Sequence, residues 1–195
     1  GSNTAVGYKA LEANTTASQN VAVGYQAGYS NTTAGNNVLI GYKSGYTGVT
    51  ATQVTGLGSN TLVSNTGSYN TGLGYGAMYA NTSGASNTAV GVEALAANTA
   101  ASNNTAVGYQ SAYSNTTAVQ GTFVGEQAGY SNTTGLGNTF IGSDSGYLNT
   151  TGTRNQFFGK NSGELITTGS KNTIIGAYNG NQGGLDIRTA SNNVV

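Results

Sequence analysis

A repeat with a constant period of 17 runs through the chain and limits its possible folds more than any other feature. The phrase NTAVGY occurs at Asn3–Tyr8 and again at Asn104–Tyr109, and near-copies fill the interval. Aligning the copies on the glycine of this phrase gives eleven positions, termed anchor glycines: Gly7, Gly24, Gly41, Gly58, Gly74, Gly91, Gly108, Gly125, Gly142, Gly159 and Gly176. The sequence numbers of consecutive anchor glycines differ by 17, except for one interval of 16 between Gly58 and Gly74. Such a short, constant period is typical of solenoids, in which each repeat stacks on the next.

The residue types within one repeat favour short strands joined by turns. Glycine makes up 32 of the 195 residues, more than twice its usual share of about 7%. Together with Asn and Ser it indicates many turns, whereas Val, Ile, Thr and Tyr are typical of strands. The repeat is too short for a helical hairpin, but it fits two strands of about five residues with a turn after each. We therefore predict an all-β fold: a parallel β-solenoid of about eleven coils over residues 1–188, followed by a C-terminal tail at 189–195.

The three residues that directly precede each anchor glycine predict which side chains of a strand face the inside of the coil. The residue just before the glycine is apolar in every copy, and the residue two places earlier is mostly Thr or Val. Because side chains alternate along a strand, we expect both of these columns to face the inside of the coil. The residue between them is then expected to point outward.

This middle column contains no polar residue. It reads Ala5, Ala22, Leu39, Gly56, Gly72, Ala89, Ala106, Phe123, Phe140, Phe157 and Ile174. An apolar outer column on a thin coil needs cover from another chain, so we predict that it forms the contact surface of a homo-oligomer. A register error of one residue would exchange the inner and outer columns, and this alternative stays open.

Two further columns are predicted to be structural. Three residues after the anchor glycine the chain carries Ala, Ser or Thr, as at Ala27, Ser111 and Ser145, which fits a narrow coil interior. A column of asparagines is expected to form a hydrogen-bonded ladder along the solenoid axis. Its members are Asn14, Asn31, Asn65, Asn81, Asn98, Asn115, Asn132 and Asn149.

The composition removes several classes of function. The chain has no His and no Cys, which excludes Ser-His-Asp and cysteine-dependent catalysis and metal sites built on imidazole or thiolate. Six Lys or Arg balance six Asp or Glu, so we expect no nucleic-acid partner, and no apolar run is long enough for membrane insertion. Glu126 and Asp144 fall on neighbouring coils, but no insertion forms a pocket around them. We therefore predict a protein that is not an enzyme, with no catalytic residue, metal or cofactor.

The repeat also resembles those of known surface fibres. The segments NVAVGYQAGYSNTT at Asn20–Thr33 and NTAVGYQSAYSNTT at Asn104–Thr117 are similar to repeats of bacteriophage tail fibres. The N-x-T-A-V-G unit is similar to the repeats in the heads of trimeric autotransporter adhesins, although each coil of this chain is longer. The resemblance covers nearly the whole chain. It implies a left-handed parallel β-roll, a homotrimer around one axis, and a place on a virion tail or on the outside of a cell.

We therefore expect a structural shaft segment that supports attachment to a host surface. One alternative is a module that binds a host glycan or receptor through exposed tyrosines, which fall in two columns of the repeat. The tyrosines expected to bind are Tyr25, Tyr29, Tyr42, Tyr46, Tyr75, Tyr79, Tyr109 and Tyr113. A lesser alternative is ice binding by a threonine ladder, although the threonines before the anchor glycines are expected to face inward and are mixed with valine.

Overall fold

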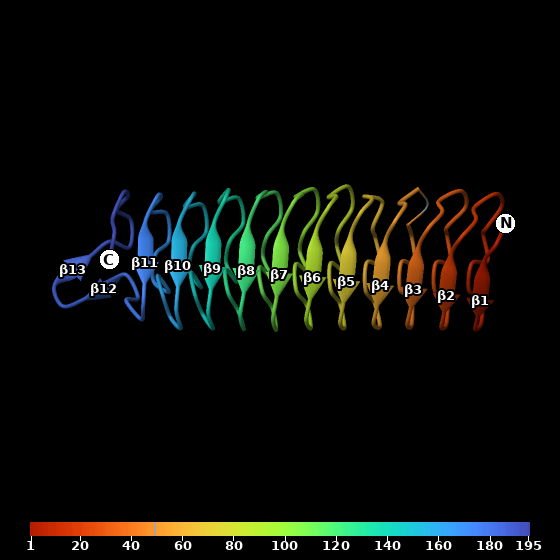
Figure 1. Ribbon diagram of the computed structural model, residues 1–195, viewed down its shortest axis with the longest axis horizontal. Helices are drawn as coiled ribbons and strands as arrows, with labels where there is room; N and C mark the ends of the chain where they lie inside the picture. The colour runs from red at the N-terminus through yellow and green to blue at the C-terminus, as the bar shows by residue number, and fades with distance from the viewer. Residues whose placement is uncertain (49) are drawn as a thin grey trace.

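The computed structural model describes residues 1–48 and 50–195 and shows the parallel β-solenoid that the repeat predicts (Figure 1). Eleven three-residue strands lie side by side in chain order. They are β1 (Thr4–Val6), β2 (Val21–Val23), β3 (Val38–Ile40), β4 (Thr55–Leu57), β5 (Thr71–Leu73), β6 (Thr88–Val90), β7 (Thr105–Val107), β8 (Thr122–Val124), β9 (Thr139–Ile141), β10 (Gln156–Phe158) and β11 (Thr173–Ile175). Each strand pairs in parallel with the next, at the same position of the repeat. We number the coils, or rungs, by the strand that each contains.

Each described rung contains one strand of three residues, so the prediction of two longer strands was wrong. The reason is the backbone conformation after the anchor glycine. In rung 6, Glu93 and Leu95 have φ angles of 56° and 51°, which place them in the left-handed region and turn the chain instead of extending it. Hydrogen bonds between rungs still continue through this turn, as from the N–H of Leu95 to the carbonyl of Ser111 at 3.0 Å. The coil is thus held by backbone bonds even where it is not a strand.

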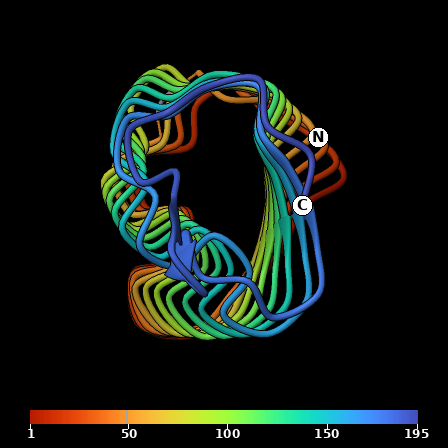
Figure 2. The ribbon, with the colours of Figure 1, turned by 90° about the vertical axis from the view of Figure 1, so that its left-hand side faces the viewer.

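The anchor glycine is required by both its conformation and its neighbour. Gly74 has a φ of 130°, and a Cβ added there would lie 2.5 Å from the carbonyl oxygen of Gly91 on the next rung. A side chain is therefore excluded at this corner, because the backbones of adjacent rungs approach too closely. Viewed along the axis, the rungs superpose as nested loops with one flat side, which is formed by the strands (Figure 2).

The middle residue of each strand faces the interior of the coil, so its predicted outward placement was wrong. Ala22, Leu39, Ala89, Ala106, Phe123, Phe140, Phe157 and Ile174 are all buried, as are Gly56 and Gly72; Ala5, on the first rung, is exposed. The register alternative holds, and the flanking positions of the strand point outward. The predicted stacking of the large members is confirmed, but inside the solenoid: the rings of Phe140 and Phe157 are parallel, with centroids 4.8 Å apart.

The interior is filled by a pair of positions that compensate for each other in size. The middle residue of the strand faces the residue four places after the anchor glycine. Where the strand carries Phe140, the facing residue is Gly146, and a Cβ there would lie 2.5 Å from the Phe140 ring. Where the strand carries Ala89, the facing position holds the buried Leu95. Most rungs therefore receive one large side chain, and none receives two, which would not fit. Rungs 2 and 7 carry small residues at both positions, as at Ala106 and Ala112.

The predicted small column is also buried where the structure describes it beyond the first rung. Its hydroxyl groups bond to the strand across the interior: Ser111 Oγ donates to the carbonyl of Phe123 at 2.9 Å, and Ser145 Oγ to that of Phe157 at 3.2 Å. These bonds satisfy polar groups that burial would otherwise leave without partners. The column thus ties the turn to the strand within a thin coil.

Buried asparagines form two ladders along the axis. The predicted column is confirmed in part: Asn98 Nδ2 donates to Asn81 Oδ1 at 2.6 Å, whereas within the described residues Asn149 has no side-chain partner. A second column, at the residue that precedes each strand, is asparagine except at Val54 and Gly121 and was not predicted as a ladder. There the Oδ1 atom of Asn87 accepts the N–H of Asn104 at 2.9 Å, while Asn87 Nδ2 donates to the carbonyl of Ala101 at 2.8 Å. Each such asparagine joins two rungs.

A short hairpin interrupts the repeat after β11. It consists of β12 (Asn181–Gln182) and β13 (Leu185–Asp186), which pair antiparallel. The tail at 189–195 then returns to the stack, where Thr173 and Val194 form a parallel bridge. The N–H of Asn193 continues the second asparagine ladder by donating to Asn172 Oδ1 at 3.0 Å. The tail therefore packs as part of a further rung.

Candidate functional site

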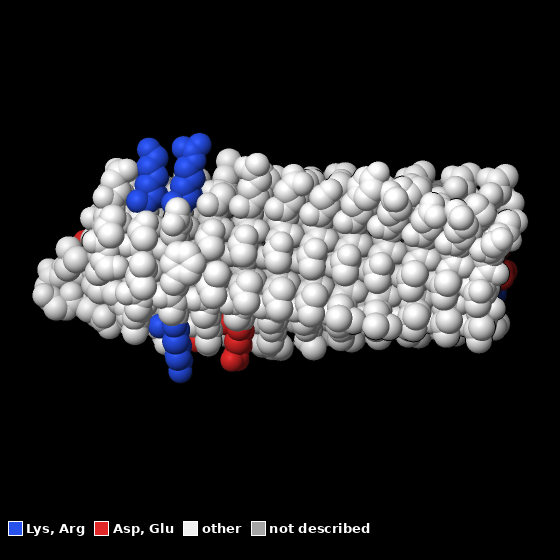
Figure 3. Space-filling view, in the orientation of Figure 1, with Lys and Arg blue, Asp and Glu red and all other residues white. Residues whose placement is uncertain are grey.

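The outer side of the strands forms the first candidate surface, which we term the flat face. It consists of the first and third residues of β1–β11. The third residues form an apolar column, and several are well exposed: Val6, Leu57, Leu73, Ile141 and Ile175. The first residues are Thr at eight of eleven rungs: Thr4, Thr55, Thr71, Thr88, Thr105, Thr122, Thr139 and Thr173. The space-filling view of this side shows charged groups only at its edges and ends (Figure 3).

The geometry of the flat face is regular in two directions. Rungs repeat at about 4.8 Å, and the two outward residues of one strand are about 6.6 Å apart. Threonine and valine thus present two straight rows to the outside, and not to the inside as predicted. The outward placement removes one of the two reasons against ice binding by a threonine ladder. The other remains, because the row mixes threonine with valine, and the second row is apolar and contains no threonine.

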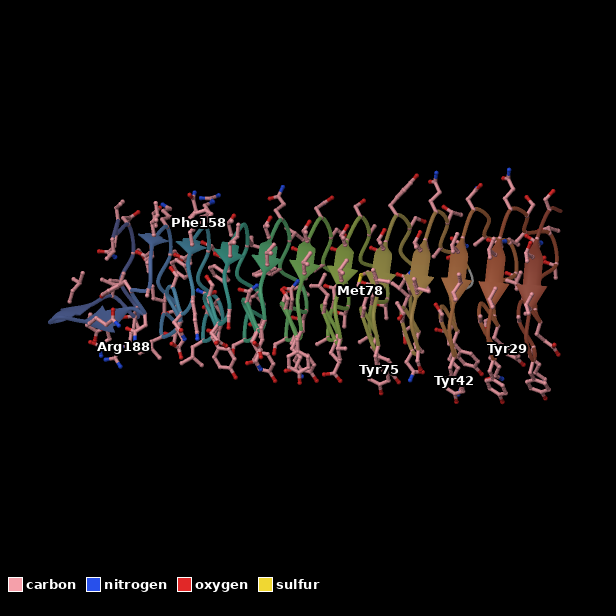
Figure 4. The ribbon with its side chains drawn as sticks, turned by 60° about the horizontal axis from the view of Figure 1, so that its bottom comes forward. Tyr29, Tyr42, Tyr75, Met78, Phe158 and Arg188 are labelled. Atoms are coloured by element: carbon pink, nitrogen blue, oxygen red, sulfur yellow. The ribbon has the colours of Figure 1, made fainter. Side chains whose placement is uncertain are left out.

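The second candidate surface is the tyrosine edge, which lies just beyond the anchor glycines. We define it by the residues one, two and five places after each anchor glycine. Figure 4 shows Tyr29, Tyr42 and Tyr75 along one edge of the solenoid. Tyr25 and Tyr42 stack with ring centroids 5.3 Å apart, and Tyr29 and Tyr46 with centroids 5.2 Å apart. The structure therefore brings four of the eight predicted tyrosines together in two short rows.

The other four predicted tyrosines lie on the same edge but around an interruption. Tyr75 and Tyr79 belong to rung 5, whereas Tyr109 and Tyr113 belong to rung 7. Rung 6 carries Val92 and Ala96 where its neighbours carry these rings. Beside this interruption lies a pocket of about 350 Å³. Its lining residues are Asn60, Tyr75, Gly76, Tyr79, Glu93, Ala96, Ala97 and Tyr113.

Two lysines lie among the tyrosine rings at the N-terminal end of this edge, and sequence reasoning missed them. Lys43 Nζ lies 5.4 Å from the ring centroid of Tyr42 and 5.2 Å from that of Tyr46. Lys9 Nζ lies 5.7 Å from the centroids of both Tyr8 and Tyr29. The carboxylate of Glu12 raises the pKa of Lys9, and the two tyrosines contribute less to the same shift. The signal was present in the sequence, because each lysine directly follows a tyrosine of the first column.

Among the described residues, the acidic side chains show little of the arrangement that catalysis needs. The backbones of Glu126 and Asp144 are on adjacent rungs, with the N–H of Asp144 bonded to the carbonyl of Glu126 at 2.9 Å. The Asp144 carboxylate accepts a hydrogen bond from its neighbour Ser143 at 3.0 Å. Within residues 1–48 and 50–195, no group of three or more Asp, Glu, His or Cys gathers as metal ligands would. In the same residues no helix is long and apolar enough to cross a membrane.

The flat face and the tyrosine edge are thus the surfaces on which a function of this chain can be argued. In comparisons with family models, curated proteins and solved structures, nothing matches the chain.

Proposed function

We propose that the chain is a structural segment of an extended fibre, of the kind found in a phage tail fibre or a bacterial surface adhesin. In this role it supports attachment to a host surface from the virion tail or the outside of a cell. The observation that carries the proposal is the flat face, an uninterrupted apolar column on eleven rungs in register. Backbone bonds and the asparagine ladders join every described rung to the next, which favours a stiff rod over a flexible chain.

The proposal includes a homo-oligomer, and we place its interface on the outward residues of the strands. The middle residues of the strands are inside the coil, so the contact surface is assigned to the third residues, such as Val107 and Ile141. The flat face covers roughly 500 Å², estimated as about 53 Å of stacked rungs by about 10 Å of width. Part of this area belongs to the threonine row and the rest to the apolar column, and a contiguous exposed apolar column is typical of an interaction surface. A second copy fits it best, because its rungs repeat at the same spacing; the resemblance to trimeric fibres favours three copies.

The mass in solution tests this proposal. We expect light scattering to give about three times 19.5 kDa for the unaltered chain. Val107→Glu places a charge on the flat face and is expected to lower the mass toward that of one chain while the circular dichroism spectrum is kept. Val92→Glu is the matched control, because Val92 is 42% exposed on the tyrosine edge, outside the flat face. A monomer for the unaltered chain, or equal masses for both variants, would refute the interface.

A second candidate function is glycan binding by the tyrosine edge. It is favoured by the stacked rows, in which Tyr25 and Tyr42 remain 43% and 46% exposed. Aromatic faces of this kind pack against sugar rings, and the phenolic groups supply hydrogen bonds. A glycan array distinguishes the two functions: binding by the unaltered chain that Tyr25→Ala and Tyr42→Ala abolish supports a binding module, and no binding favours a shaft alone.

A further inference from the structure

The tyrosine edge contains its own example of cation binding. In rung 3 the side chain two places after the anchor glycine is Lys43, and its ammonium lies between the rings of Tyr42 and Tyr46. The distances of 5.4 and 5.2 Å are within the range at which the face of an aromatic ring attracts a cation. In rung 1 the position five after the anchor glycine holds Glu12, and Lys9 lies beside Tyr8 of its own rung and Tyr29 of rung 2. In rung 3 the positions one, two and five after the anchor glycine thus form a unit of two rings and one cation.

Rung 5 keeps the two rings and lacks the lysine. Tyr75 and Tyr79 occupy the ring positions, but Gly76 stands where Lys43 stands in rung 3. The backbone is alike at both residues, with φ angles of 64° and 52°. On the next rung the second ring position holds Ala96, which leaves space between Tyr79 and Tyr113. These two small residues account for the pocket of about 350 Å³, which falls at the lower end of the range for small-molecule sites.

A carboxylate lines the same pocket. Glu93 contributes its side chain from rung 6, and Gln110 Nε2 donates a hydrogen bond to Glu93 Oε2 at 2.8 Å. Within residues 1–48 and 50–195, the ion pairs are Lys9 with Glu12 and Arg188 with Asp186, so no lysine or arginine neutralises Glu93. The pocket therefore combines three tyrosines with one negative charge, where rung 3 combines two tyrosines with a positive charge.

We propose that the pocket formed by Tyr75, Tyr79, Glu93 and Tyr113 binds an alkylammonium cation. The cation occupies the place that the lysine ammonium takes in rung 3, with the ring faces around it and the Glu93 carboxylate as its counter-charge. A neutral sugar carries no positive charge for that carboxylate to attract. The cation is carried either by a small quaternary ammonium group or by a lysine side chain. The site is independent of the proposed fibre function, because its residues lie outside the flat face.

Titration of the tyrosine ring resonances by NMR tests the proposal. Choline chloride and n-butylammonium chloride are the two cationic probes, and 3,3-dimethylbutan-1-ol is the neutral isostere of choline. We expect saturable shifts with at least one cation and binding of the isostere that is about tenfold weaker or absent. Saturation by choline alone indicates a quaternary group, and equal saturation by n-butylammonium indicates a lysine. Equal binding of the neutral isostere, or no saturable shift with either cation, overturns the proposal.

Variants locate the site. Gly76→Lys supplies the missing lysine on a backbone that already carries Lys in rungs 1 and 3, and it is expected to abolish binding without unfolding the chain. Glu93→Gln removes only the charge and is expected to weaken binding about tenfold. Glu126→Gln is the matched control, because it removes a carboxylate from the tyrosine edge two rungs away. If Gly76→Lys binds choline as the unaltered chain does, the cation is bound elsewhere and the assignment is wrong.

Discussion

Exchanging the large and small residues of one rung tests the interior directly. Phe140 is completely buried, with its ring 4.8 Å from Phe157 and 5.6 Å from Phe123. Truncation by Phe140→Ala removes these contacts and leaves a cavity, so the free energy of unfolding is expected to fall by about 3–5 kcal/mol. Ile141→Ala is the neighbouring control. Its side chain is 38% exposed on the flat face, and we expect a loss of about 1 kcal/mol or less when the protein is monomeric.

The second single variant places a large side chain at the position that faces Phe140. Gly146→Leu alone forces a side chain against the Phe140 ring, where a Cβ would lie 2.5 Å from ring carbons, and overpacking is expected to cost about 1–3 kcal/mol. The combined variant Phe140→Ala with Gly146→Leu gives rung 9 the same pair as Ala89 and Leu95 in rung 6. Leu95 has a φ of 51°, so leucine is compatible with the backbone of this position. We expect the combined variant to be within about 2 kcal/mol of the unaltered chain, a favourable coupling of about 3 kcal/mol.

Guanidinium unfolding, followed by circular dichroism and by tyrosine fluorescence, measures all four free energies. The coupling is the difference between the effect of the combined variant and the sum of the two single effects. If the two substitutions are simply additive, residues 140 and 146 do not share one cavity. The assignment of the middle strand residue to the interior would then be wrong, and with it the placement of the flat face.

Three further outcomes are expected. Asn87→Ala removes the acceptor for the buried N–H of Asn104 and the donor to the carbonyl of Ala101. Chemical unfolding should therefore show a free energy of unfolding that is lower by about 1–3 kcal/mol. A loss near zero would exclude a structural role for the second ladder. Hydrogen bonds from Arg188 lower the pKa of Asp186, so this contact contributes to hairpin order above the ordinary carboxyl pKa and is lost as the pH falls through the lowered value. A carboxyl titration by NMR should therefore show the midpoint of Asp186 below its ordinary value, and Arg188→Gln should raise it. The unaltered oligomer should show no thermal hysteresis in freezing solutions, because its threonine rows lie beside the proposed contact surface; a clear hysteresis would instead favour ice binding.

The repeat predicts the solenoid because a constant period leaves few other ways to bury apolar residues. The anchor glycines from Gly7 to Gly159 each meet the backbone of the next rung, and this close approach is what keeps glycine at that position of the repeat. The orientation of the strand was harder to predict. Val107 and Ala106 are both apolar, so alternation alone does not say which of them is inside, and the column that is apolar in every copy was assigned to the interior. The structure shows the reverse, with the middle residue of the strand buried from rung 2 onward.

A signal for the correct orientation exists in the sequence, in positions that lie six residues apart. Phe123, Phe140 and Phe157 are each followed six residues later by glycine, whereas Ala89 is followed by Leu95. Opposite sizes at two positions indicate that they share one limited volume, and a surface column would show no such compensation. The pocket on the tyrosine edge was beyond sequence reasoning for a different reason. It depends on Gly76 and Ala96 being neighbours in space, although they belong to different copies of the repeat and occupy different positions within it.

The side chains of the strand face the opposite way from the prediction, and an oligomer is still expected, but for a different reason. The phenylalanines that were predicted to need cover on the outside are buried inside the coil. Turning them inward turns the valine, isoleucine and leucine column outward, where Leu57 and Ile141 are 43% and 38% exposed. Together with Phe158 these residues make one straight column of eleven residues, which leaves water in contact with apolar surface along the whole rod. Because the column has no gap and one constant spacing, a partner that covers it needs the same spacing over the same length, and a second copy of this chain meets that condition.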